Sequence, residues 1–144
     1  MKKSLLFIIL VLIIPCVLAS NHINADFQII ENKVLVDLKI DNVDNLELKI
    51  PYNAEALEVN SAYTLENNIL KVVSAENLEI RYITDANIDK TGYKYYFVLK
   101  KQFTQPIDLV LYLPEGAILL EPEVVFPANP ERTTDGRRII LSWN

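Results

Sequence analysis

The chain has 144 residues, a net charge of −5 at neutral pH, one cysteine and one histidine, His22, near the N-terminus. Zinc sites and imidazole-dependent nucleophilic catalysis draw on these scarce residues, so both are disfavoured. The acidic balance also argues against nucleic acid and anionic lipid as main partners. The three glycines are scattered and form no phosphate-binding loop, and we expect no cofactor.

The N-terminal segment has the three-part layout of an export signal. Two lysines precede an apolar run from Leu5 to Ile14, and Ala19 ends a suitable peptidase site. The apolar stretch is shorter than the roughly 20 residues that span a bilayer. We therefore predict that residues 1–19 are a signal peptide and that residues 20–144 form a single domain outside the cytoplasm, with an uncleaved anchor as the alternative.

Cys16 would become a lipidated N-terminus if this segment were a lipoprotein signal. Pro15 lies directly before it and would resist the peptidase, so we treat Cys16 as an apolar filler. Membrane contact is expected only through an uncleaved or lipidated N-terminus.

Behind this segment, apolar residues recur at every second position, which is the period of a strand with one buried face. No stretch keeps a helical period, so the sequence predicts an all-β fold. The pattern is found at Val34, Val36, Leu38 and Ile40; at Leu46, Leu48 and Ile50; at Leu78, Ile80 and Tyr82; at Tyr93, Tyr95, Phe97 and Leu99; at Ile107, Leu109, Leu111 and Leu113; and at Ile139, Leu141 and Trp143.

Turn-forming residues separate these stretches and predict their register. Tight turns are expected at Asn32-Lys33, at Asn67-Asn68 and at Asp135-Gly136. The first would pair Ile29 with Val36, Phe27 with Leu38 and Ala25 with Ile40, and the second would pair Leu65 with Leu70 and Tyr63 with Val72.

Short strands separated by turns at intervals of roughly ten residues are typical of two antiparallel sheets packed face to face. We therefore expect an antiparallel immunoglobulin-like β-sandwich. A β-barrel is the alternative, because periodicity identifies the buried face of each strand but not whether the sheet closes.

The last third of the chain contains Leu113-Pro-Glu-Gly-Ala117 and Thr134-Asp-Gly-Arg-Arg138, followed by a final strand that ends at Trp143. This ending resembles that of uncharacterised archaeal ectodomains, which are secreted or membrane-anchored β-sandwiches. The resemblance implies the fold and an extracytoplasmic location, but no activity. Such proteins often continue into a C-terminal transmembrane helix. This sequence departs from the pattern because it has no such helix after Trp143, so we expect a short secreted or N-terminally tethered version.

Oxygen-bearing side chains alternate at Asp85, Asn87, Asp89 and Thr91, a spacing that could converge on Ca²⁺. The stretch lacks the glycine and the bidentate glutamate of an EF-hand loop. We favour a solvated turn and keep a calcium-stabilised adhesin as an alternative.

Paired carboxylates could serve glycoside hydrolysis, and Glu121 and Glu123 share one side of an extended segment. The neighbouring prolines favour a charged strand edge instead. A small secreted hydrolase that uses paired carboxylates is therefore an alternative function.

An aromatic stretch supplies the one candidate binding patch. Alternation groups Tyr93, Tyr95 and Phe97 on a face that we expect to pack in the core, whereas Tyr96 shares the other face with Lys94 and Lys100. We therefore predict a non-enzymatic binding or structural module of the cell surface whose partner is a protein or a glycan, with Lys94, Tyr96 and Lys100 as the candidate patch.

Overall fold

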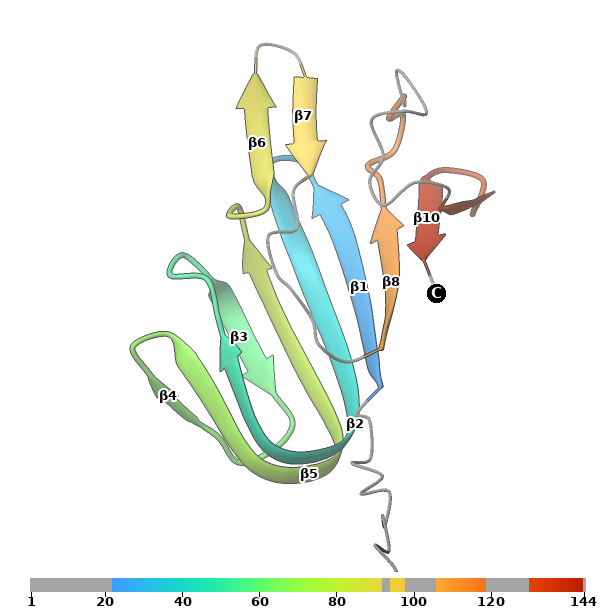
Figure 1. Ribbon diagram of the computed structural model, residues 1–144. Helices are drawn as coiled ribbons and strands as arrows, with labels where there is room; N and C mark the ends of the chain where they lie inside the picture. Colours follow the sequence, from blue (N-terminus) through green and yellow to red (C-terminus); the bar gives the residue numbers. More distant parts are fainter. Residues whose placement is uncertain (1–21, 92–93, 98–105, 119–129, 144) are drawn as a thin grey trace, which may run out of the picture.

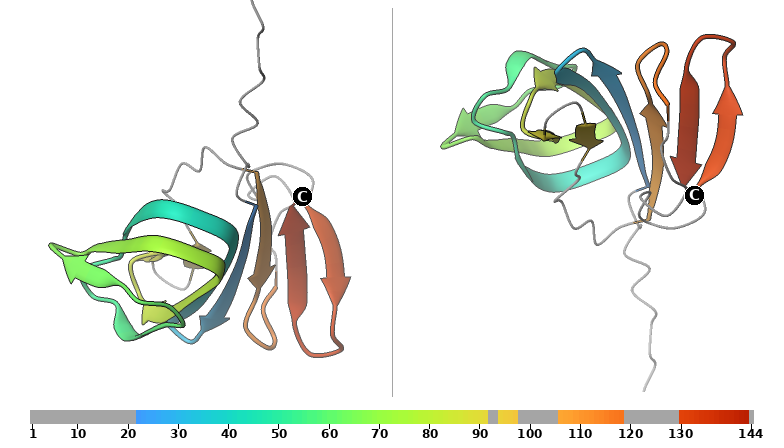
Figure 2. Two further views of the ribbon diagram at one scale, coloured as in Figure 1. Left: turned by 90° about the horizontal axis from the view of Figure 1, so that it is seen from below. Right: turned by 90° about the horizontal axis from the view of Figure 1, so that it is seen from above.

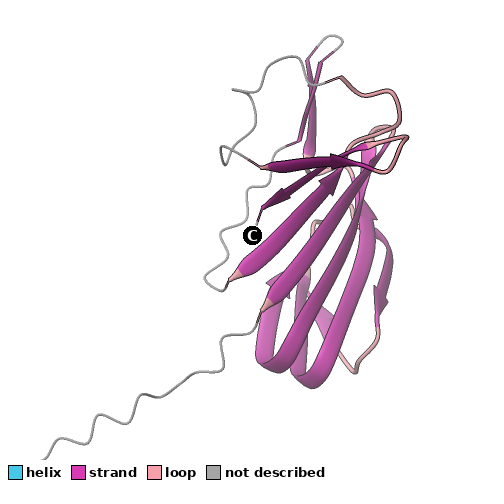
Figure 3. Ribbon diagram, turned by 90° about the vertical axis from the view of Figure 1, so that its right-hand side faces the viewer, coloured by secondary structure: helices cyan, strands magenta, loops and turns pink. Residues whose placement is uncertain are grey.

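The computed structural model describes residues 22–91, 94–97, 106–118 and 130–143, and the predicted signal peptide lies outside these ranges. The described residues form strands and connecting loops without any helix, which confirms the predicted all-β class (Figures 1 and 3). The strands are β1 (Ile23–Ile30), β2 (Lys33–Lys49), β3 (Glu55–Val59), β4 (Thr64–Glu66), β5 (Ile69–Thr84), β6 (Ile88–Thr91), β7 (Lys94–Phe97), β8 (Ile107–Tyr112), β9 (Glu131–Thr134) and β10 (Ile139–Trp143).

Among the described residues, eight strands form one mixed sheet in the order β3-β5-β2-β1-β8-β10-β9, with β4 also beside β5. Strands β1 and β8 run parallel, and the other neighbours are antiparallel. This arrangement corrects the prediction of two separate antiparallel sheets, and the sheet is not closed into a barrel. Sequence alternation identifies the buried face of a strand, but it does not identify the partners of that strand.

The two longest strands, β2 and β5, pair along their whole length and bend together (Figure 2). Across the bend, inward residues follow one another at three-residue intervals, with Ile40, Val43 and Leu46 opposite Leu78, Ala75 and Val72. Asn42 and Asn45 lie between them with φ angles of 51° and 53°, a left-handed conformation that asparagine tolerates better than most residues. The β2–β5 hairpin therefore curls over its own inner face.

One hydrophobic core lies inside this curl, and Trp143 packs against it while remaining partly exposed. Full burial of one Val, Leu, Ile or Phe side chain contributes roughly 1.5–3 kcal/mol, so this core is a main source of the domain's stability. The inward faces predicted for β2, β5, β8 and β10 are confirmed. The buried apolar residues are Ile23, Ala25, Phe27, Val34, Val36, Leu38, Ile40, Val43, Leu48, Ile50, Leu70, Val72, Leu78, Ile80, Tyr82, Leu111, Leu113 and Leu141.

Two of the predicted tight turns are confirmed. Asn67 and Asn68 have φ angles of 50° and 61°, as a type I′ turn requires, and Leu65 pairs with Leu70. Gly136, with a φ of 89°, lies in the turn between β9 and β10.

The first hairpin turns one residue earlier than predicted, at Glu31-Asn32, where Glu31 has a φ of 56°. Ile29 lies opposite Val34, Phe27 opposite Val36 and Ala25 opposite Leu38, so the predicted register is wrong by two residues. A two-residue slip leaves the same side chains on the buried face, so the apolar pattern does not distinguish the two registers.

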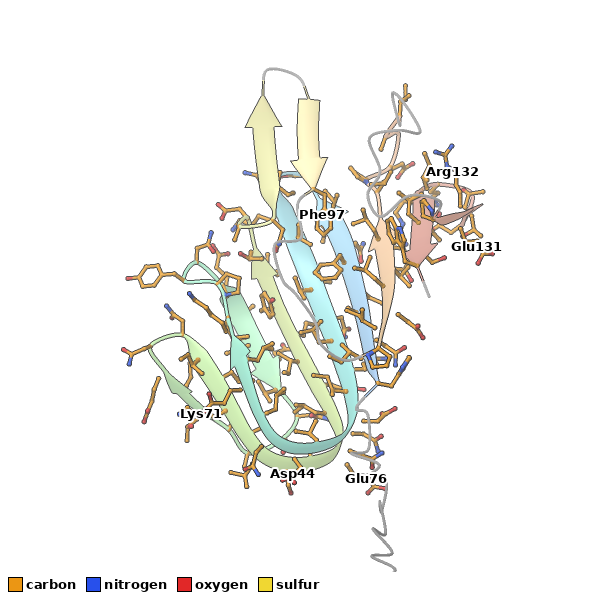
Figure 4. The ribbon with its side chains drawn as sticks, viewed as in Figure 1. Asp44, Lys71, Glu76, Phe97, Glu131 and Arg132 are labelled. Atoms are coloured by element: carbon orange, nitrogen blue, oxygen red, sulfur yellow. The ribbon has the colours of Figure 1, made fainter. Side chains whose placement is uncertain are left out.

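The start of β1 and the β6–β7 hairpin lie at opposite ends of the molecule (Figure 1). β1 begins at the bend of β2 and β5, where Asp44 and Glu76 are located (Figure 4). There Nε2 of His22 lies 2.8 Å from Oδ2 of Asp108, and the N–H of Ile23 donates to the carbonyl oxygen of Pro106 at 3.1 Å. These contacts hold the chain to β8 from His22 onward. Within the described ranges, no helix has the length and apolarity to cross a membrane.

Candidate functional site

The β6–β7 hairpin stands apart from the eight-stranded sheet. It follows β5 and projects beyond the ends of β1 and β2 (Figure 1). At its base Ile88 pairs with Phe97, and both residues pack against the core. The ring of Phe97, labelled in Figure 4, meets that of Phe27 edge to face with centroids 5.4 Å apart. Such a contact contributes roughly 0.5–1.5 kcal/mol, so the base of the hairpin is fixed to the sheet.

Two of the three predicted patch residues belong to this hairpin. Lys94 and Tyr96 lie in β7, where their backbones pair with Thr91 and Asp89 of β6. Phe97, at the end of the same strand, packs against the core, which confirms the core position predicted for it. The third residue, Lys100, lies outside the described residues.

The residues of the possible calcium loop do not all share one loop. Asp85 and Asn87 lie in the connection between β5 and β6, whereas Asp89 and Thr91 lie within β6. In the part of the chain that the structure describes, no group of three His, Cys, Asp or Glu side chains is placed to hold a metal ion. The other acidic pair considered from the sequence, Glu121 and Glu123, lies outside the described residues.

Asp85 instead connects the turn before β6 to the segment between β2 and β3. Its carbonyl oxygen accepts the N–H of Ile88 at 3.0 Å, and its carboxylate accepts a hydrogen bond from Nδ2 of Asn53. Oδ1 of Asn53 in turn accepts the hydroxyl of the buried Thr84 at 3.0 Å. These bonds hold the chain at the point where the β6–β7 hairpin leaves the sheet.

A row of charged side chains that the sequence did not predict crosses the outer face of the sheet. Backbone pairing aligns Glu58, Arg81, Asp37 and Asp26 on β3, β5, β2 and β1. Nη2 and Nε of Arg81 donate to Oδ2 of Asp37 at 2.6 and 3.2 Å. This hydrogen bonding, and then the negative charge of Asp37, raise the pKa of Arg81.

Asp26 lies opposite a like charge, that of Asp37. Partial burial raises the pKa of Asp26 above its usual range, the charge of Asp37 raises it further, and Lys39 opposes both effects. On its other side Asp26 lies beside Val110 of β8. Asp26 and Asp37 therefore form a carboxylate pair in which Asp26 holds its proton more tightly than a free aspartate does.

Beside this row lies a shallow depression of about 190 Å³ that opens to solvent. Asn60 forms part of its wall and is held by β5, since its Nδ2 donates to the carbonyl oxygen of Asn77 at 3.0 Å and its Oδ1 accepts the N–H of Glu79 at 2.8 Å. The depression is a surface feature rather than an enclosed pocket. Its lining residues are Asp37, Glu58, Val59, Asn60, Glu79 and Arg81.

The turn between β9 and β10 is fixed by Asp135. Its carboxylate accepts the backbone N–H groups of Arg137 and Arg138 at 3.0 and 2.8 Å and Nε of Arg138 at 3.0 Å. These hydrogen bonds lower the pKa of Asp135 to about 2. The guanidinium of Arg138 also lies 5.2 Å from the ring centroid of Tyr112, so this segment fastens the turn to β8.

No model of a known protein family matches the chain, and no curated protein matches it significantly. The features available for inferring a function are therefore those of the molecule itself: an all-β domain, a projecting hairpin and a carboxylate pair on the outer face of the sheet.

Proposed function

We propose that this protein is a non-enzymatic binding module that works outside the cytoplasm and contacts its partner through the β6–β7 hairpin. The observation that carries this proposal is the position of the hairpin, which stands outside the main sheet while Ile88 and Phe97 fix its base to the core. Binding residues are commonly presented in this way, on an exposed segment that a rigid scaffold positions.

The proposed location rests on the layout of residues 1–19. If this segment remains attached, the hairpin points away from the membrane, because β1 begins at the opposite end of the domain (Figure 1). We also propose a sandwich-like ectodomain of the kind that the C-terminal segments resemble. Support comes from the curl of β2 and β5, which places residues from both sides of the bend in one core.

Retention on cell-envelope material from the protein's own source tests this function. The protein is purified in the form in which the cell processes it, and we expect envelope material to retain it. Lys94→Ala combined with Tyr96→Ala should reduce retention. The matched control is Lys49→Ala with Tyr52→Ala, which removes an exposed lysine and a tyrosine that is 91% exposed, both outside the hairpin. Absence of retention, or equal losses in both double variants, would contradict the proposal.

A secreted hydrolase is a second candidate because Asp26 and Asp37 lie directly opposite each other. Residues in such pairs have Cβ atoms about 4.5–5.5 Å apart, which resembles the carboxyl separation of about 5–5.5 Å in retaining glycosidases. Asp26 would be the acid, since its pKa is raised, and Asp37 the nucleophile. Release of reducing ends from a panel of glycans, lost in Asp26→Asn, would support this function, and the absence of release would reject it.

A further inference from the structure

We infer that the exported protein binds a Cu²⁺ ion at its N-terminus. The ligands are the amine of Ser20, the backbone nitrogens of Asn21 and His22, and Nδ1 of the His22 ring. This site is separate from the β6–β7 hairpin and rests on the expected cleavage after Ala19. It follows from the place of the histidine in the cleaved chain and from the contact of its ring with Asp108.

Cleavage after Ala19 makes His22 the third residue of the exported chain. At this spacing a free amine, two backbone nitrogens and an imidazole nitrogen follow one another along the covalent chain, and they close consecutive small chelate rings around one ion. Neither Asn21 nor His22 is a proline, so each backbone nitrogen carries a proton that a metal ion can replace. The first three residues of the cleaved chain therefore supply a complete set of nitrogen ligands.

The geometry of these ligands selects the metal. Consecutive chelate rings hold the nitrogens in one plane, and planar nitrogen coordination is typical of Cu²⁺ and Ni²⁺, of which Cu²⁺ binds more tightly. Zn²⁺ prefers tetrahedral coordination and fits such a plane poorly. The site needs no cluster of acidic, cysteine or further histidine side chains, and the part of the chain that the structure describes contains none that would hold a metal ion.

The ring of His22 is already positioned for this role. Its Nε2 lies 2.8 Å from Oδ2 of Asp108. An imidazole that donates its Nε2–H to a carboxylate keeps a lone pair on Nδ1, which is the ring nitrogen that the chelate uses. A carboxylate in this position orients a metal-binding histidine and strengthens it as a ligand. The side chains of His22 and Asp108 are 43% and 40% exposed, so a hydrated ion can reach the ring.

The contacts that hold this part of the chain do not compete with the metal. The N–H of Ile23 donates to the carbonyl oxygen of Pro106 at 3.1 Å, and the N–H of Asp41 donates to the carbonyl oxygen of His22 at 3.4 Å. All the ligand atoms precede that carbonyl group along the chain, and β1 begins only at Ile23. Copper binding therefore requires no change in the sheet.

Titration of the purified, cell-processed protein with Cu²⁺ tests the inference, after intact mass has shown where the chain begins. Excess free glycine is present to remove loosely held copper. We expect one Cu²⁺ per chain that begins at Ser20, the visible absorption of planar nitrogen-coordinated Cu²⁺, and release of protons on binding. An equal concentration of Zn²⁺ should not displace the copper.

Asn21→Pro removes one of the backbone N–H groups and should abolish binding, whereas the matched control Asn21→Ala should bind as the wild type does. Asp108→Asn should weaken binding roughly tenfold, as loss of a partner of a ligating histidine usually does. Circular dichroism shows whether each variant retains its strands. A mass that retains residues 1–19, equal binding by Asn21→Pro and Asn21→Ala, or displacement of copper by Zn²⁺ would overturn the inference. Unchanged affinity in Asp108→Asn would overturn the role of Asp108.

Discussion

Tyr82 places an ionisable phenol in the core. Its side chain is 6% exposed, and burial raises its pKa from 10 to about 12. Between these values the unfolded chain gains free energy by releasing the proton, while the folded chain retains it. Stability should therefore fall by about 1.4 kcal/mol for each pH unit in this window.

We expect Tyr82→Phe to remove this alkaline loss. Urea unfolding at about pH 9 and about pH 11 should show a smaller decrease in the free energy of unfolding for the variant than for the wild type. Tyr52→Phe is the control, because Tyr52 is 91% exposed. An equal alkaline decrease in wild type and Tyr82→Phe would show that Tyr82 does not cause it.

Asp26 destabilises the fold in its charged form, because partial burial and Asp37 both raise its pKa above 3.8. Protonation of Asp26 contributes favourably to the free energy of unfolding. This contribution is complete below pH 3.8 and is lost as the pH rises through the raised pKa of Asp26. Asp26→Asn should therefore stabilise the protein at neutral pH by a few tenths of a kcal/mol, and by less in acid.

Chemical unfolding of Asp26→Asn at neutral and acidic pH measures this difference. Asp37→Asn is the contrasting variant, because it removes the carboxylate that accepts the hydrogen bonds of Arg81 and should destabilise by about 0.5 kcal/mol. Destabilisation by Asp26→Asn at neutral pH would contradict this account of the pair.

At the scale of elements, the bend in β2 depends on two asparagines in the left-handed region. Asn42→Val should cost about 1–2 kcal/mol, because a β-branched residue is strained at a φ of 51°. Asn42→Gly should change the free energy of unfolding much less, because glycine adopts this φ readily. Urea midpoints measure both, with Asn24→Val in the regular strand β1 as the control. Equal changes in the free energy of unfolding for Asn42→Val and Asn42→Gly would contradict the proposed backbone strain.

Much of the secondary structure could be predicted from the sequence, because one-sided burial leaves a two-residue period in strands such as β8 and β10. The bend was not predicted, since Ile40, Val43 and Leu46 interrupt that period. The parallel pairing of β1 with β8 was also missed, because it joins distant segments that no local signal connects.

The candidate sites likewise divide into one that lies within a single strand and one that depends on the pairing of two strands. That Lys94 and Tyr96 lie in one strand could be predicted, because they are two residues apart in the sequence, while their binding role stays a prediction. The pair of Asp26 and Asp37 could not, because the register predicted for the first hairpin places Asp26 opposite Lys39, an attractive pair. The observed turn at Glu31-Asn32 exchanges that cation for Asp37. One residue in a turn therefore decides whether a carboxylate meets an opposite or a like charge.

At the scale of the whole molecule, the first strand begins very close to the predicted export signal. His22 contacts Asp108, and β1 starts at Ile23. We expect the exported protein to begin at Ser20, which leaves two residues before His22. Intact-mass measurement of the native protein, with fractionation between medium and membrane, tests this expectation. A mass that retains residues 1–19, or that shows acylated Cys16, would contradict cleavage after Ala19.

The parallel pair of β1 and β8 also has a consequence for the order of folding. β1 is synthesised first, yet one of its two partners begins at Ile107, so the middle of the sheet stays incomplete until the last third of the chain is available. Such long-range pairing slows folding. A slowly folding chain remains extended for longer during synthesis, which suits passage through a narrow translocation channel. For a chain that is exported as we propose, the topology that delays completion of the sheet thus favours folding after export.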